Sequence, residues 1–350
     1  MDALIRLLEQ HRSAHPAAEI QDTVKFLHQS FMGPGHLIPD ESAAIAKLEE
    51  EWDQIPGDPS APPAELLGNG LCRLSLSYCK GIGLSTKTVA KIFFHTARDV
   101  VQDAEGLQKM LDSIVPHNSS EAEYLAQYRS LGCPMVSHSE SYRAAYAPAY
   151  RVVFSDFLNL LPVLAAIDLR MAEGGPVFVA LDGPCASGKS TLGARLAEIY
   201  GCPLFHMDDF FLRPEQRTPE RLAQPGGNVD YERFDREILT PLAEGRPACF
   251  RPWQCHSGHF ADEQTVPPGP LMVVEGSYSM RPELRERYDL RVWVEAPWEV
   301  RLERLSRRGG ADCVQRYQTL WIPMEDRYFE FYQVKGCCHI VISGCAPTNL

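Results

Sequence analysis

The sequence has no uninterrupted apolar run of the roughly 18 residues that a membrane-spanning helix needs. Its beginning, MDALIRLLEQHR, lacks the basic start, the apolar core and the cleavage site of a secretory signal. Bases are few: 34 lysines and arginines stand against 46 acidic residues, and the net charge is −12. We therefore expect a protein without membrane or nucleic-acid partners.

The sequence also lacks any CxxC pair, although it contains 11 cysteines. The number is odd, and Cys337 and Cys338 are adjacent, which disfavours a disulfide between them. Cysteines scattered in this way are typical of a reduced chain rather than a secreted disulfide framework. We expect a cytoplasmic protein.

The 350 residues suffice for two domains, and the pattern of the sequence changes near residue 175. Residues 1–150 show helical periodicity and few strand-like runs, which predicts a mostly α-helical domain with a substrate-binding or regulatory role. Residues 151–174 predict a linker helix that Pro162 would kink. In residues 175–350 short apolar runs alternate with helical stretches, which indicates an α/β fold with a parallel sheet covered by helices on both faces.

A phosphate-binding loop begins this second domain. GPCASGKST, residues 183–191, fits G-x-x-x-x-G-K-[ST] and lies between an apolar strand and a predicted helix. Its backbone N–H groups and the helix N-terminus would hold phosphates, Lys189 would reach the β- and γ-phosphates, and Ser190 would bind Mg²⁺. The predicted nucleotide-binding residues are Gly183, Ala186, Ser187, Gly188, Lys189, Ser190 and Thr191.

Carboxylates follow two further predicted strands. Asp208 and Asp209 lie within HMDDFF, at the end of a strand expected beside the phosphate loop, and Glu275 lies within LMVVEG, at the end of another strand. Ligands of open α/β sheets bind at the carboxyl ends of strands. There Asp208 could accept a proton from an attacking hydroxyl, and Ser190, Asp208 and Glu275 could hold Mg²⁺, partly through water. The alternative role for each carboxylate is to cap the next helix.

These motifs, with NVDYERFD (228–235) and an arginine-rich helix, resemble the uridine kinase and phosphoribulokinase group of P-loop kinases. The resemblance covers about residues 176–345. It implies ATP and Mg²⁺ as cofactors, Asp208 as the catalytic base, and acceptor contacts from Asp209 and Asp230. It also implies that RLERLSRRGG is a lid, in which Arg304 and Arg308 join Lys189 in stabilising transferred charge. The alternative for these arginines is a solvated helix face.

The sequence departs from the group where a uridine-binding stretch is expected. Arg251, Pro252 and Trp253 lead into Gln254 and His256, so that an aspartate of the family pattern is replaced by glutamine. Trp253 and His256 remain candidate substrate residues. The departure indicates an acceptor pocket that differs from that of a nucleoside kinase.

One stretch of the first domain, HSESYRAAYAPAYRV (138–152), is rich in tyrosine, histidine and arginine. Polar-tipped aromatic residues at this density are unusual for a helix that packs in a core. Tyr142 and Arg143 are therefore candidate substrate residues in a pocket wall. The alternative is a tyrosine-rich surface between domains.

The sequence thus predicts phosphoryl transfer from Mg-ATP to a hydroxyl of a small molecule. A pyrimidine nucleoside kinase and a nucleotide-dependent regulatory ATPase stay open as alternatives. The acceptor, the preference for ATP or GTP and the oligomeric state stay open too, and copies of the chain could associate.

Overall fold

The computed structural model describes residues 2–34 and 40–345. The chain divides into two compact units at the junction between Leu161 and Pro162. None of the helices in the described part is long and apolar enough to cross a membrane.

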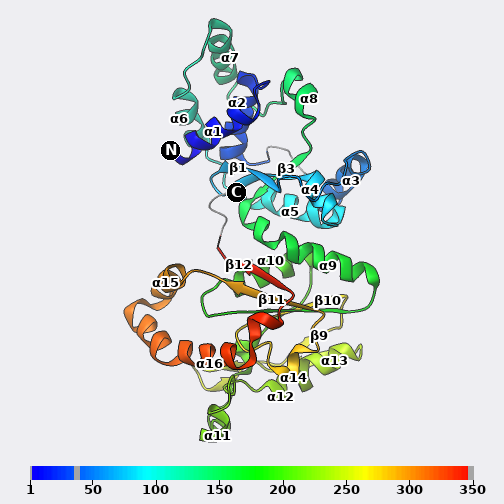
Figure 1. Cartoon of the computed structure of the whole chain (residues 1–350), viewed down its shortest axis with the longest axis vertical. Coiled ribbons are helices and arrows are strands. Elements are labelled where there is room, and N and C mark those ends of the chain that lie inside the picture. Colours follow the sequence, from blue (N-terminus) through cyan, green and yellow to red (C-terminus); the bar gives the residue numbers. More distant parts are fainter. Residues whose placement is uncertain (1, 35–39, 346–350) are drawn as a thin grey trace. The chain divides into compact units, whose positions relative to one another are not determined.

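The N-terminal unit combines helices with a small antiparallel sheet (Figure 1). The sheet has the order β1-β2-β3, with β1 at Ala64–Gly68, β2 at Leu71–Ser75 and β3 at Tyr150–Phe154. Apolar residues of α2, among them Phe26 and Leu27, pack with Leu67 and Leu71 of the sheet to form the core of this unit. The helices are α1 (Asp2–Ala14), α2 (Ile20–Met32), α3 (Glu41–Trp52), α4 (Leu76–Gly81), α5 (Thr86–Asp99), α6 (Ala104–Asp112), α7 (Ser119–Ser130) and α8 (Glu140–Tyr146).

The predicted linker helix begins later than its sequence suggests. Residues 150–154 form the strand β3, which pairs with β2, and a short 3₁₀ helix at Ser155–Leu160 precedes α9 (Leu161–Glu173). Two valines and two aromatic residues among the five favour the strand. Pro162 lies in the first turn of α9, where a missing N–H costs nothing, so that it starts the helix and does not kink it.

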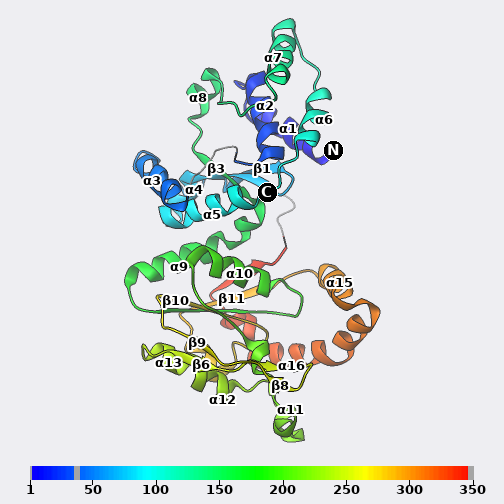
Figure 2. The same ribbon diagram turned by 180° about the vertical axis from the view of Figure 1, so that it is seen from behind.

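The C-terminal unit is built on a parallel five-stranded sheet of order β12-β11-β4-β10-β5. Helices α9 and α10 cover one face, and α14 and α16 lie on the other (Figures 1 and 2). The sheet strands are β4 (Val177–Asp182), β5 (Leu204–His206), β10 (Leu271–Glu275), β11 (Leu290–Glu295) and β12 (Ile340–Ser343). Short strands outside the sheet are β6 (Ala248–Phe250), β7 (Trp253–Gln254), β8 (His259–Phe260) and β9 (Gln264–Val266). The helices after α9 are α10 (Lys189–Tyr200), α11 (Pro219–Leu222), α12 (Tyr231–Phe234), α13 (Thr240–Ala243), α14 (Pro282–Arg285), α15 (Trp298–Arg316) and α16 (Ile322–Tyr332).

Strand register brings the polar residues to one edge of this sheet. All residues of β4 and β10 are buried, as expected for central parallel strands, and Glu275 at the end of β10 is paired in register with His206 at the end of β5. Strand β10 lies between β4 and β5. The strand before Asp208 is therefore one position farther from the phosphate-loop strand than the sequence suggests.

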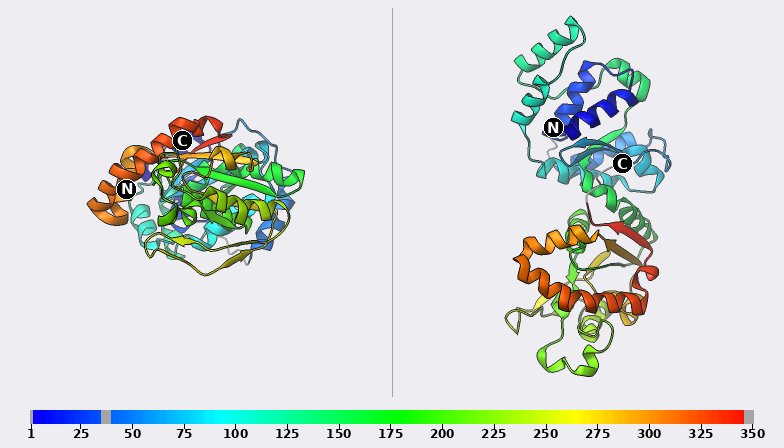
Figure 3. Two further views of the ribbon diagram at one scale, coloured as in Figure 1. Left: turned by 90° about the horizontal axis from the view of Figure 1, so that it is seen from below. Right: turned by 60° about the vertical axis from the view of Figure 1, so that its left-hand side comes forward.

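Helices α15 and α16 are the orange and red-orange helices of the C-terminal unit (Figure 3). Helix α15 is interrupted by Gly309 and Gly310, whose backbone is not helical, and Gly310 has φ of +66°. A left-handed residue of this kind favours glycine. The arginine-rich lid predicted from the sequence, RLERLSRRGG, thus belongs to the first of two helical segments and ends at the glycine pair that joins them.

Candidate functional site

The phosphate loop turns tightly between β4 and α10. Gly183 has φ of +144°, and a Cβ atom there would lie 2.1 Å from the carbonyl oxygen of Val294. Gly188 has φ of +109° and precedes the first residue of α10, so that the backbone N–H groups of the helix start face the loop. Only glycine fits both positions. The loop therefore has the geometry that the sequence motif requires for phosphate binding.

The loop carbonyls have cationic partners. Lys189 is buried, and its Nζ donates to the carbonyl oxygens of Gly183 and Pro184 at 2.7 and 3.0 Å. Arg301 Nε donates to the Cys185 carbonyl, and Arg304 Nη1 to a further carbonyl of the loop, both at 2.9 Å. These contacts hold the loop in its turn.

A buried carboxylate from α16 also contacts the loop. Glu325 accepts a hydrogen bond from the backbone N–H of Cys185 at 2.9 Å and another from the hydroxyl of Ser277 at 2.7 Å. Asp182 at the end of β4 accepts from the N–H of Gly183, and burial raises the pKa of its carboxyl to about 6. Sequence reasoning did not single out Glu325, since its partners are far away in the chain.

A chain of side chains crosses the ends of the strands. The Ser190 hydroxyl donates to Glu275 Oε2 at 3.1 Å, and the other oxygen of Glu275 lies 2.6 Å from Nδ1 of His206. This hydrogen bond raises the pKa of His206 above its usual range. The serine and the carboxylate predicted to hold Mg²⁺ are therefore adjacent, and His206 orients the carboxylate.

Asp208 lies in the 3₁₀ turn after β5 and faces the same space. The carboxyl is accessible to water within a concave site, where surrounding protein removes much of its hydration. This desolvation, aided by the nearby charge of Glu275, raises the pKa of Asp208 to about 6. A carboxyl with such a pKa is suited to accept a proton near neutral pH.

These groups line a cavity of about 530 Å³. From the predicted set it contains Ala186, Gly188, Lys189, Ser190, Thr191, Asp208, Glu275 and Arg308. The fit to ATP with Mg²⁺ is supported by the glycine-bounded loop and by Ser187, whose buried hydroxyl has no hydrogen-bond partner among the described residues. Oxygen ligands at Ser190 and Glu275 are of the type that Mg²⁺ prefers.

The lid arginines separate into two groups. Arg304 donates to backbone carbonyls of the phosphate loop and of Gly344, so that its guanidinium supports the loop. Arg308 lines the cavity, as does Arg316 on the far side of the glycine pair. Arg316 belongs to the same arginine-rich helix but lies beyond RLERLSRRGG, and the sequence prediction missed it.

The remaining predicted acceptor residues lie outside this cavity. Asp209 is half-buried, and its carbonyl accepts from Arg233. Asp230 caps α12, accepts from Gln216 at 2.7 Å and lines a separate pocket of about 490 Å³. Trp253 is buried in β7, 5.1 Å from the ring of Phe260 between centroids, and His256 is in the exposed turn after β7.

Aromatic side chains, and not these predicted acceptor residues, form one wall of the cavity. Phe211, Tyr317 and Trp321 line the cavity, and the rings of Phe211 and Trp321 lie 5.7 Å apart. Phe211 belongs to HMDDFF, so that the motif itself gave a signal for it. Tyr317 and Trp321 follow α15 in a π-helical turn at Tyr317–Trp321, for which the sequence gave none.

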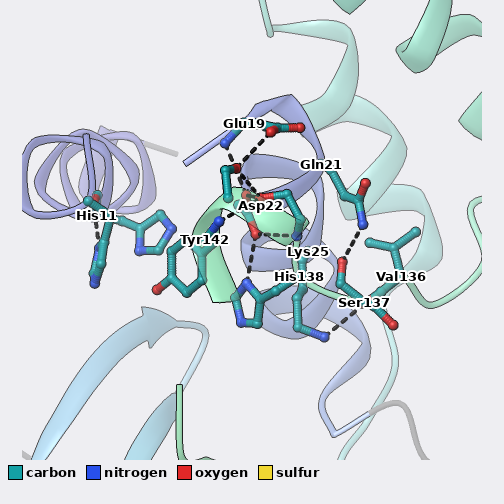
Figure 4. Close-up of polar contacts among 12 residues, drawn as sticks. His11, Glu19, Gln21, Asp22, Lys25, Val136, Ser137, His138 and Tyr142 are labelled. Atoms are coloured by element: carbon teal, nitrogen blue, oxygen red, sulfur yellow. Dashed lines mark hydrogen bonds and ion pairs between the residues drawn. The ribbon is translucent and has the colours of Figure 1, made fainter. Parts of the chain in front are cut away.

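The predicted substrate residues of the N-terminal unit lie on α8. The Ser139 hydroxyl and His138 Nδ1 contact the carboxylate of Asp22 at 2.6 and 2.7 Å (Figure 4). Tyr142 is buried, stacks on His138 with ring centroids 4.1 Å apart and lines a pocket of about 480 Å³ within this unit. Arg143 is exposed. Their contact with a substrate stays a prediction.

Comparison with known proteins places the C-terminal unit among the kinases. A cytidylate kinase of Methanopyrus kandleri is 30% identical over 172 residues, which cover 45% of this chain and 77% of that protein. The chain belongs to the P-loop kinases. A uridine kinase of Deinococcus deserti is 29% identical over 172 residues, 44% of this chain and 82% of that protein. The chain is thus similar to kinases of both kinds, and P-loop kinases use ATP with Mg²⁺.

Other similarities are more distant. A bifunctional shikimate kinase/3-dehydroquinate synthase of Thermotoga maritima is 26% identical over 159 residues, and the chain spans 28% of its length. A solved structure of a possible uridine kinase from Bacillus stearothermophilus is 18% identical, with a TM-score of 0.40, and the match covers 52% of this chain and 99% of that one. No family model matches the chain. The matched shares amount to about half of this chain.

Proposed function

We propose that the kinase unit transfers the γ-phosphoryl group of ATP to a hydroxyl of a small molecule, with Asp208 as the base. The observation that carries this proposal is a desolvated carboxyl with a pKa of about 6 in the cavity that also contains Lys189 and Ser190. Phosphoryl transfer relies on positioning and charge stabilisation, and the base accepts the proton of the acceptor.

The charges around Asp208 favour a hydroxyl acceptor over a phosphate acceptor. Asp208, Glu275 and Glu325 all line the cavity, and Asp209 lies next to them in the sequence. A phosphate acceptor is already ionised near neutral pH, so that it needs no base. A neutral hydroxyl needs one, and Asp208 lies in the cavity where it could act as that base.

Other residues of the unit have roles that follow from their positions. Lys189, released from the loop carbonyls, and Arg308 neutralise charge that develops on the transferred group. Ser190 and Glu275 hold Mg²⁺, which bridges the phosphates when bound. The aromatic wall of Phe211, Tyr317 and Trp321 excludes water from the acceptor side.

The test is a screen for phosphorylated product with Mg-ATP and a panel of nucleosides, sugars and hydroxy acids. Mass spectrometry reads the gain of one phosphoryl group. We expect a product that disappears in Lys189→Ala and falls by a factor of about 10² to 10⁴ in Asp208→Asn, the usual contribution of a general base. Asp262→Asn, at an exposed aspartate, is the matched control. A product that Asp208→Asn forms at the normal rate would overturn the role of the base.

The panel includes nucleosides because uridine kinases are among the relatives. Rapid phosphorylation of uridine or cytidine would select a pyrimidine nucleoside kinase. ATP hydrolysis without product from any acceptor would select a nucleotide-dependent regulatory ATPase instead and reject the proposal.

We also propose that the chain acts in the cytoplasm, without nucleic-acid partners, and that copies of it associate. The organisation we propose is a helical domain at 1–150 with a substrate-binding or regulatory role, a linker at 151–174 and the kinase domain at 175–350. The acidic net charge supports the absence of nucleic-acid partners, and the absence of disulfides among the described cysteines supports the cytoplasmic location. Sedimentation of the full chain tests the association.

A further inference from the structure

We propose that the N-terminal unit binds one divalent transition-metal ion of the zinc class through His11, His15 and Glu65. One nitrogen of each histidine and one carboxylate oxygen of Glu65 lie within 4.8 Å of one another. His11 is on α1, His15 follows the end of that helix, and Glu65 is on β1. All three line the same pocket of about 480 Å³. This site is separate from the kinase site and does not depend on the proposed kinase function.

Hydrogen bonds already fix the orientation of His15. Its Nδ1 donates to the backbone carbonyl of His11 at 2.9 Å, which leaves Nε2 as the nitrogen with a free lone pair. A backbone carbonyl on the other ring nitrogen is the arrangement that metal-binding histidines commonly have.

His11 and Glu65 are within the distance at which a proton is shared. His11 Nδ1 lies 2.5 Å from Glu65 Oε1, while Nε2 of the same ring is buried without a partner among the described residues. The side chain of His11 is 0% exposed. A divalent ion bound by Nδ1 and Oε1 would take the place of the proton between them, because histidine binds a metal through a deprotonated nitrogen.

The carboxylate is held from its other side. Arg73 Nη1 donates to Glu65 Oε2 at 2.9 Å, and Arg73 Nε donates to Gln29 at 2.8 Å, so that Oε1 is left for the histidine side. Arg73 is itself buried between the rings of Phe26 and Tyr150. Partners of this kind orient a ligand and tune its affinity. Because the guanidinium also cancels the carboxylate charge, a bound divalent ion would keep a net positive charge.

The type of ion follows from the donors. Two imidazoles and one carboxylate suit Zn²⁺, Co²⁺ or Ni²⁺, whereas Mg²⁺ and Ca²⁺ prefer oxygen ligands alone. Three protein ligands leave a coordination position open, and the pocket wall beside it carries Tyr142 and Tyr146. The uncompensated charge of the ion means that this position takes an anionic oxygen group, such as a carboxylate of a small molecule or hydroxide.

The test is a titration of the full chain with Co²⁺ and with Zn²⁺, without nucleotide and with Mg²⁺ in large excess. We expect one ion per chain and a visible Co²⁺ spectrum without the absorption of a thiolate ligand. His15→Ala, at a half-buried residue, and Glu65→Gln should each weaken binding by about 100-fold, the upper range seen even for supporting residues. His117→Ala removes an exposed histidine of the same unit and should bind as the unaltered chain does.

Circular dichroism of each variant shows whether it is folded. If Glu65→Gln does not fold, the comparison of His15→Ala with the unaltered chain decides the outcome. Thiolate absorption in the Co²⁺ complex would place the ion on a cysteine and overturn the proposal. Equal affinity in His15→Ala and the unaltered chain would overturn it as well, and so would the absence of any tight binding. Kinase activity is not part of this readout, so failure here leaves the proposed function unaffected.

Discussion

A carboxyl with a pKa of about 6 changes its charge close to the pH of the cell, and Asp208 is such a group. Below that pH the folded site holds Asp208 protonated, and a protonated carboxyl cannot accept the proton of a hydroxyl. We therefore expect kcat/KM to fall about tenfold per pH unit below about pH 6 and to be flat above it. Rates measured between about pH 5 and 8 check this. A profile that stays flat down to an ordinary aspartate pKa would contradict it.

His206 allows a second prediction at the scale of single residues. Its ring contacts Glu275, which in turn accepts from Ser190. His206→Ala should free the carboxylate to rotate and raise the Mg²⁺ concentration for half-maximal rate by roughly 10-fold, with kcat less affected. His206→Asn, which can keep a hydrogen bond, is the control and should recover part of the loss. Equal Mg²⁺ dependence in all three proteins would show that His206 has no positioning role.

The position of a single residue in the candidate site was predictable where the residue belongs to a short sequence motif. Gly183, Lys189 and Ser190 follow from one loop, and Asp208 from the end of the strand before it. Glu325 could not be found in this way, because its partner Cys185 lies 140 positions earlier and only the fold joins them. Arg316 was missed for a related reason, since its place in the cavity depends on the change of direction in α15.

At the scale of elements, α16 supports the phosphate loop through Glu325. Glu325→Gln keeps the size of the side chain but replaces a charged acceptor that binds the Cys185 N–H and the Ser277 hydroxyl. We expect the variant to lose about 1–3 kcal/mol of unfolding free energy and to bind ATP more weakly. Denaturant unfolding and nucleotide titration measure both quantities. Glu330→Gln, at an exposed position of the same helix, should change neither.

Helices and strands were predicted best where the sequence has a strong periodic pattern of apolar residues. The helical periodicity expected within residues 1–150 is seen in helices such as α3 and α5, and the apolar runs after residue 175 form the strands of the parallel sheet. Strand β3 was wrongly expected to be helical. Its five residues gain their stability from pairing with β2, some 80 positions earlier, and such pairing leaves little trace in the local sequence.

At the scale of the molecule, the chain has two units with separate apolar cores. We expect calorimetry of the full chain to show two unfolding transitions. Mg-ATP at about 100 times its Kd should stabilise only the kinase unit, by about 2.7 kcal/mol. Zn²⁺ should stabilise only the N-terminal unit. His15→Ala should abolish the effect of Zn²⁺ and keep that of ATP. A single transition that both ligands raise together would contradict independent unfolding.

The pattern of the sequence changes near residue 175, whereas the chain divides between Leu161 and Pro162. The sequence analysis placed Tyr142 in a pocket wall, and Tyr142 lines the pocket of the N-terminal unit, but the rest of that pocket could not be predicted. Its wall is drawn from α1, the two strands β1 and β2, and α8, and no segment of the sequence carries more than a few of its residues.

The glycine pair in α15 separates two positive charges, Arg308 on one side and Arg316 on the other. Rotation about Gly309 and Gly310 changes the distance between the two guanidinium groups without breaking a regular helix. The distance between the two guanidinium groups is therefore set by the φ and ψ torsions of these two glycines. Replacement of Gly310 by alanine would disfavour its positive φ and so restrict that distance, while the phosphate loop itself stays the same.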